Sequence, residues 1–148
     1  MKRVRFEHAS RLSGTLVARA RELGIIVAQP RSSAAYRSWL TAGIPVAYGS
    51  DGQPNPFVDF AAAVTMSKRP AEAISREEAA IILTRGSAVA EWQEAIKGMI
   101  APGMLADFAI LSQDIFSVPA TALPSTRSVL TVVGGRVVHA SGAIIVPR

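Results

Sequence analysis

The chain has 148 residues, of which 49% are hydrophobic and 18% are charged, and it contains no cysteine. This size and composition fit one compact domain and exclude an intrinsically disordered chain. The lack of cysteine excludes a disulfide scaffold, a thiolate metal site and a cysteine nucleophile. Apolar runs such as 60–64 are far too short to cross a membrane, and no signal-peptide pattern follows Met1. We therefore expect a cytoplasmic protein that does not enter a membrane.

The net charge is +5, from 16 basic and 11 acidic residues, and the isoelectric point is near 10.4. Basic domains often bind nucleic acid. Here the arginines and lysines are scattered, in runs of no more than two, and no aromatic residues alternate with them. The sequence therefore favours solvated helix faces, and we expect no nucleic-acid partner.

Strands and helices alternate in the first half of the sequence. Val4 and Phe6 alternate with charged residues, which is typical of a strand. Ile25 to Ala28 is a short apolar run between turn residues, as expected for a strand buried on both faces. Asn55-Pro56 and Ser75 have the pattern of helix starts. The predicted elements are a strand at 3–8, a helix at 12–23, a strand at 25–28, a helix at 32–42, a strand at 44–48, and helices from 55 and from 75.

After residue 97 the sequence predicts short strands joined by turns. Gly134-Gly135 between two β-rich runs is the strongest hairpin signal in the chain. The predicted elements are strands at 106–111, 128–133, 136–139 and 143–146, with a loop at 112–125. We therefore predict an α/β fold with an alternating segment at 1–97 and a small β-rich subdomain at 98–148.

The alternating order implies parallel strands, and ligands of such folds bind at the carboxyl ends of the strands. His8 ends the first predicted strand, and Asp51 follows the third. These two residues are the candidate site. Asp51 also has a structural interpretation, because an aspartate between serine and glycine commonly stabilises a turn.

Five segments, in order, resemble the C-terminal part of amidohydrolase-superfamily enzymes, in the subgroup of D-aminoacylases and related amide hydrolases. The first, Phe6-Glu7-His8-Ala9, is similar to the end of the sixth barrel strand, whose histidine binds metal. The second, residues 42–51, is similar to the eighth strand, whose terminal aspartate is a metal ligand and proton acceptor. The other three segments are 84–88, 98–108 and 131–138.

This resemblance implies about three βα units of a TIM-type barrel, followed by part of the small antiparallel sandwich of these metal-dependent hydrolases. It implies that His8 and Asp51 are metal ligands and that Asp51 is the catalytic carboxylate. The family's paired histidines of strand one, bridging lysine of strand four and histidine of strand five have no counterpart in the sequence. His139 falls in the sandwich region, and Ser50 lacks the pattern of an activated nucleophile.

Two functions follow as alternatives. The first is hydrolysis of a carbon–nitrogen bond other than a peptide bond, in a small-molecule amide, by a complete enzyme that uses a divalent metal, with zinc the leading candidate. The second is a truncated, non-catalytic remnant that binds no metal and acts as a structural or self-associating module. An open three-stranded sheet leaves two unpaired edges and an uncovered apolar face. We therefore expect self-association or a complementary barrel fragment as partner.

Overall fold

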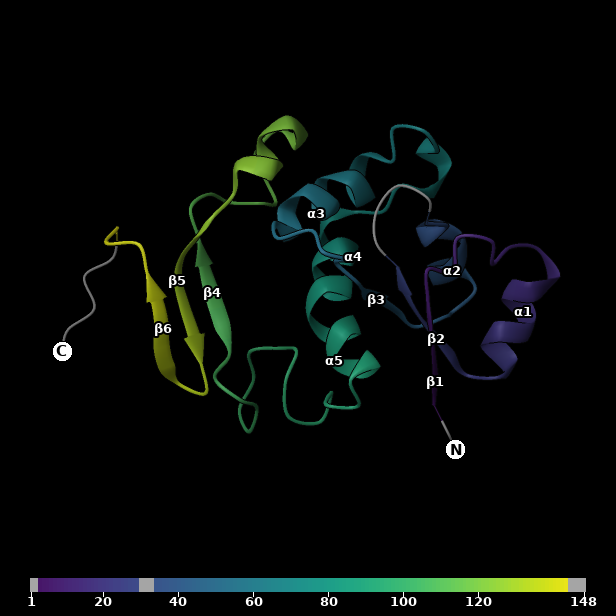
Figure 1. Ribbon diagram of the computed structural model, residues 1–148, viewed down its shortest axis with the longest axis horizontal. Helices are drawn as coiled ribbons and strands as arrows, with labels where there is room; N and C mark the ends of the chain where they lie inside the picture. Colours follow the sequence, from purple (N-terminus) through teal and green to yellow (C-terminus); the bar gives the residue numbers. More distant parts are fainter. Residues whose placement is uncertain (1–2, 30–33, 144–148) are drawn as a thin grey trace.

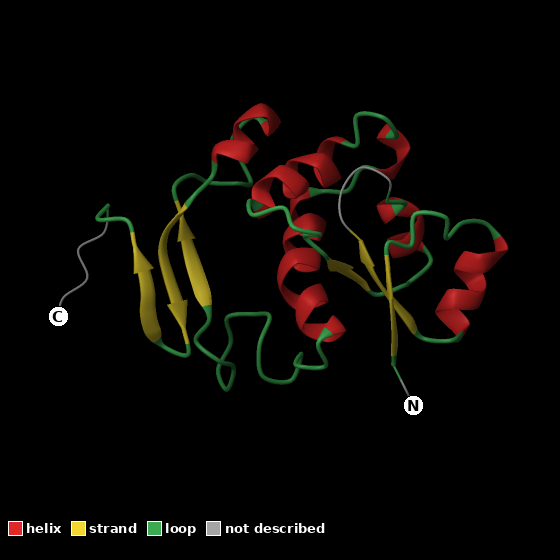
Figure 2. Ribbon diagram, in the orientation of Figure 1, coloured by secondary structure: helices red, strands yellow, loops and turns green. Residues whose placement is uncertain are grey.

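The computed structural model describes residues 3–29 and 34–143. Two separate three-stranded sheets form its framework (Figures 1 and 2). The first is parallel, with the order β1 (Val4–Glu7), β2 (Ile25–Gln29) and β3 (Val46–Tyr48). The second is antiparallel, with the order β4 (Phe108–Leu111), β5 (Ser128–Val133) and β6 (Arg136–Ala140). The α/β class and the change from parallel to antiparallel strands are thus confirmed.

The helices lie between the strands at most of the expected places. They are α1 (Thr15–Glu22), α2 (Tyr36–Thr41), α3 (Pro56–Thr65), η2 (Pro70–Glu72), α4 (Arg76–Ile81), η3 (Ile82–Gly86), α5 (Ser87–Ala90) and η4 (Ala120–Ser125). The helix predicted at 32–42 begins at Tyr36, and its residues 32–33 lie outside the described residues. Of the strand predicted at 143–146, Ala143 forms a bend, and the remaining residues also lie outside the described part.

Local hydrogen bonds explain where two of these helices begin. The Asn55 side chain accepts a hydrogen bond from the backbone N–H of Phe57 at 3.0 Å, so Asn55 is the N-cap of α3. Ser75 and Glu78 form a capping box at the start of α4, as the sequence predicts. Because these contacts span only two or three residues, a short stretch of sequence is enough to predict them.

The central strand β2 is buried on both faces of the parallel sheet. Ile25 and Val27 belong to the main core, which includes Trp39 of α2 and Phe60 of α3. On the opposite face, Ile26, Ala28 and Ala47 pack against Val89 and Ala90 of α5. The expectation of an uncovered apolar face is therefore wrong for β2 and β3, while the residues of β1 are exposed. Helix α4, the π-helical turn η3 and helix α5 follow one another without a break, and α5 covers β2 and β3 on that face.

The segment 112–125, expected as a loop, contains the short helix η4 and contributes to the main core. Ile115 and Leu123 are buried there. The Arg76 guanidinium donates hydrogen bonds of 2.6 Å to the carbonyl oxygens of Ile115 and Val118. This segment therefore packs on the helices of the first half, while the boundary at residues 97 and 98 stays a prediction. Among the described helices, none has the length and apolar character that a membrane crossing requires.

Candidate functional site

His8 and Asp51 lie close together at the carboxyl edge of the parallel sheet. His8 directly follows β1, and its backbone N–H donates to the carbonyl oxygen of Ala28 at 3.1 Å. Asp51 lies in the turn after β3, where the N–H of Gln53 donates to the carbonyl oxygen of Ser50. His8 Nε2 and Asp51 Oδ1 are 3.8 Å apart, and the two side chains are 58% and 63% exposed. Because β1 and β3 are outer strands of one parallel sheet, their following residues meet at the same edge.

Both residues have a left-handed backbone conformation, with φ of 54° at His8 and 46° at Asp51. Residues other than glycine adopt this region rarely, and it recurs at functional sites. At each position the chain leaves its strand by a sharp turn. These two turns aim the imidazole and the carboxylate towards each other.

The two side chains provide ligand atoms that suit a divalent metal. Two ligands of one tetrahedral zinc ion, each about 2.1 Å from the metal, lie about 3.4 Å apart. The 3.8 Å between His8 Nε2 and Asp51 Oδ1 is close to that spacing. A catalytic zinc site uses three protein ligands. No group of three histidine, cysteine or carboxylate side chains suited to a metal occurs within residues 3–29 and 34–143.

Of the other residues considered above, His139 lies in the other sheet and Ser50 directly precedes Asp51. His139 lies in β6 of the antiparallel sheet, and its Nε2 is 3.2 Å from the carbonyl oxygen of Ser128. Ser50 is in the Asp51 turn, where its carbonyl oxygen accepts the N–H of Gln53. Neither residue joins His8 and Asp51 as a third metal ligand.

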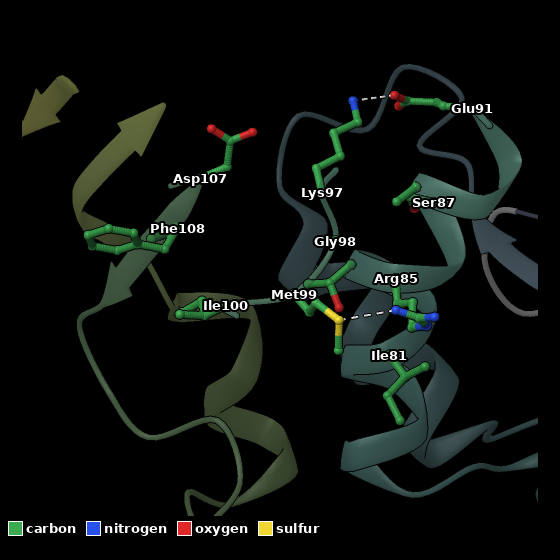
Figure 3. Close-up of a pocket in the computed structure, with 13 residues that line it drawn as sticks. Ile81, Arg85, Ser87, Glu91, Lys97, Gly98, Met99, Ile100, Asp107 and Phe108 are labelled. Carbon is green, nitrogen blue, oxygen red and sulfur yellow. Dashed lines mark hydrogen bonds and ion pairs between the residues drawn. The ribbon is translucent and has the colours of Figure 1, made fainter. Parts of the chain in front are cut away.

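A pocket of about 640 Å³ lies elsewhere, between the helices α4 to α5 and strand β4 (Figure 3). Its apolar wall includes Ile81, Ile100 and Phe108, and its charged residues include Arg85 and Lys97. Lys97 is paired with Glu91, and Arg85 Nη1 lies 3.2 Å from Met99 Sδ (Figure 3). Sequence reasoning did not predict this pocket, because its walls come from segments with no shared motif.

A polar pair with a buried carboxylate lies at the carboxyl end of β3 and was also not predicted. The Tyr48 hydroxyl donates to Asp59 Oδ2 at 2.5 Å, and Asp59 is only 2% exposed. Nearby, burial and then the charge of Asp59 raise the pKa of Tyr36 well above its ordinary value. The sequence carries one signal of this pair, since Asp59 is a charged residue among the apolar residues of α3.

The structure is an α/β fold with two potential metal ligands at the carboxyl edge of its parallel sheet. Residues 1–139 match the Amidohydrolase family, so the chain belongs to that family, as the resemblance indicated. No curated protein matches the sequence.

Solved structures of the same fold have low sequence identity to the chain. The atrazine chlorohydrolase TrzN from Arthrobacter aurescens TC1, a mutant in complex with zinc and atraton, has a TM-score of 0.75 at 24% identity, over 93% of this chain and 36% of that one. An adenosine deaminase from Xanthomonas campestris with bound zinc has a TM-score of 0.77 at 17% identity, over 95% of this chain and 38% of that one. The E. coli guanine deaminase has a TM-score of 0.75 at 19% identity, over 93% of this chain and 39% of that one. The chain thus spans well under half the length of each.

Proposed function

We propose that the chain contributes two ligands of a metal centre to an amidohydrolase that cleaves a carbon–nitrogen bond other than a peptide bond. The observation that carries this proposal is the 3.8 Å between His8 Nε2 and Asp51 Oδ1 at the carboxyl edge of the parallel sheet. Membership of the Amidohydrolase family supports it. The zinc in the atrazine chlorohydrolase and in the X. campestris deaminase makes zinc the first metal to test.

In this proposal His8 offers a neutral imidazole nitrogen, and Asp51 offers a carboxylate that also accepts the proton of the attacking water. A bound divalent metal polarises the scissile carbonyl and lowers the pKa of its water. Asp51 is suited to its role because its side chain is exposed and lies beside the imidazole. The substrate class is a small-molecule amide.

We further propose that the remaining metal ligands come from other barrel strands, since the chain covers less than 40% of the length of these structural neighbours. The three βα units would then be a partial TIM-type barrel, and residues 98–148 part of the adjoining sandwich. The missing strands would be supplied by a complementary barrel fragment or by self-association.

The alternative is a non-catalytic remnant that serves as a structural or self-associating module. One observation favours it: the described residues bring together two potential ligands where a catalytic zinc site uses three. Under this alternative the chain folds and assembles without binding metal.

Zinc binding to the purified chain, measured by equilibrium dialysis, separates the two functions. Changes to neighbours of metal ligands commonly cost 10- to 100-fold in affinity, so losing a ligand should cost at least about 100-fold. We expect this loss in His8→Ala and in Asp51→Ala, while His139→Ala, the matched control, binds as the unaltered chain does. A folded chain that binds no zinc favours the non-catalytic alternative, and equal zinc binding by all three variants contradicts the proposed metal centre.

A further inference from the structure

One hydrogen bond to a buried carboxylate connects the two ends of the loop that carries Asp51. Tyr48 is the last residue of β3, and Asp59 lies in the first turn of α3. The Tyr48 hydroxyl donates to Asp59 Oδ2 at 2.5 Å. The loop 49–55 lies between them, so this bond fixes the distance between the strand that enters the loop and the helix that leaves it.

Burying the Asp59 carboxylate costs free energy. Asp59 is 2% exposed, among side chains of the main core such as Phe60. A buried carboxylate loses its hydration, and replacing buried ionic groups by apolar residues of similar size is often neutral or stabilising. Core stability alone therefore gives little reason for an aspartate here. A directional hydrogen bond to the end of β3 gives a better one.

The rest of the loop is held by contacts at its surface. The N–H of Gln53 donates to the carbonyl oxygen of Ser50 at 2.9 Å. At the far end, the side-chain amide of Asn55 (Nδ2) donates a hydrogen bond to the carbonyl oxygen of Pro124 at 2.8 Å. Exposed contacts of this kind open easily. The Tyr48–Asp59 bond, whose carboxylate is buried, is thus better shielded from water than these contacts.

We propose that Tyr48 and Asp59 are positioning residues that hold the Asp51 loop so that Asp51 faces His8. The consequence for metal binding rests on the proposed function, because it takes Asp51 as a ligand. The positioning of the loop itself does not depend on a metal. Both parts are therefore measurable in the chain as it stands.

Hydrogen exchange measured by NMR tests the positioning part, using Tyr48→Phe, which removes only the hydroxyl. The reporter is the N–H of Gln53 in the loop, and the reference is the N–H of Val27, which donates to Pro45 in the sheet. Losing one hydrogen bond should speed exchange at Gln53 by about tenfold relative to Val27. Asp59→Asn keeps an oxygen that accepts the hydrogen bond from the Tyr48 hydroxyl. We therefore expect its ratio of the exchange rates at Gln53 and Val27 to stay near that of the unaltered chain.

The matched control is Ile25→Val, which removes one methylene group from the core at β2, away from the loop. It should lower global stability and speed exchange at Val27, while exchange at Gln53 stays as in the unaltered chain. If Tyr48→Phe and Ile25→Val give the same ratio, the pair has only a general structural role and the proposal is overturned.

Zinc affinity provides the second readout. If the unaltered chain binds zinc, Tyr48→Phe should weaken binding by about tenfold, and Asp59→Asn should weaken it less. Unchanged affinity in Tyr48→Phe would overturn the part of the proposal that concerns the metal. If the unaltered chain binds no zinc, the non-catalytic alternative is favoured, and the exchange measurement still decides whether the pair positions the loop.

Discussion

Gly86 lies so close to the backbone of Val46 that a Cβ atom added to this glycine would come within 2.2 Å of the Val46 carbonyl oxygen. Gly86 ends the π-helical turn η3, and its φ of −59° is ordinary for a helix. The glycine is therefore required for space and not for an unusual conformation. This contact brings η3 directly against β3, from where the chain continues into α5 on the second face of the sheet.

Gly86→Ala should therefore destabilise the fold. The added methyl group meets backbone atoms, which cannot move away as a flexible side chain would, and overpacking of this kind costs about 1–3 kcal/mol. Urea unfolding of the purified chain measures the loss. The neighbouring Ser87→Ala is the control, because it removes only a hydrogen bond of 3.2 Å to the Ile82 carbonyl. Equal stability of Gly86→Ala and the unaltered chain would show that η3 does not pack tightly on β3.

Glu78 should make the stability of the chain depend on pH. The Arg37 guanidinium donates to both of its carboxylate oxygens, at 2.8 and 2.7 Å, and the N–H of Ser75 donates to Oε2 at 2.7 Å. The hydrogen bond from Arg37, followed by that from Ser75, lowers the pKa of Glu78 from 4.5. Since the folded state binds the Glu78 proton less tightly than the unfolded state does, the contribution of Glu78 to the free energy of unfolding is fully present above the ordinary carboxyl pKa. It is lost as the pH falls through the lowered value.

Thermal unfolding of Glu78→Gln at several pH values checks this sign. The variant should be less stable than the unaltered chain at neutral pH, and the difference should shrink on acidification below the ordinary carboxyl range. Glu22→Gln is the control, because Glu22 forms an exposed ion pair with Arg19 that is worth little. A Glu78→Gln difference that stayed constant with pH would mean that the Arg37 contact does not stabilise the fold through its charge.

The free edge of the parallel sheet should promote self-association. Strand β1 is an outer strand, and its residues Val4 and Phe6 are nearly half exposed. An unpaired edge with apolar side chains is a site for pairing with another chain. Sedimentation velocity should therefore show mass increasing with concentration, and Phe6→Lys should shift the chain towards monomer.

The control for this prediction is Leu16→Lys, which places the same charge at an exposed apolar residue of helix α1, away from the sheet edge. It should sediment as the unaltered chain does. A stable monomer at all concentrations, or an equal effect of both variants, would show that the edge of β1 is not the contact surface.

Several elements follow from short stretches of sequence. The capping box of Ser75 and Glu78 begins α4, Asn55 begins α3, and Gly134-Gly135 joins β5 to β6. The glycines of that turn have φ of 56° and 77°, a region that glycine adopts without strain. Each of these features depends on neighbours within a few residues, so sequence reasoning could predict them.

Alternation of strands and helices also predicted that His8 and Asp51 share one edge of a sheet. The 3.8 Å between them depends on two left-handed turns and on the packing beneath the Asp51 loop, which no spacing in the sequence encodes. The sequence by itself determined the class of fold, the helix caps, the hairpin and the two candidate ligands, because these depend on local patterns. Only the tertiary structure decided that α5 covers the second face of the sheet and that Asp59 reaches Tyr48. Those contacts join segments distant in the chain, and the space left by their neighbours fixes them.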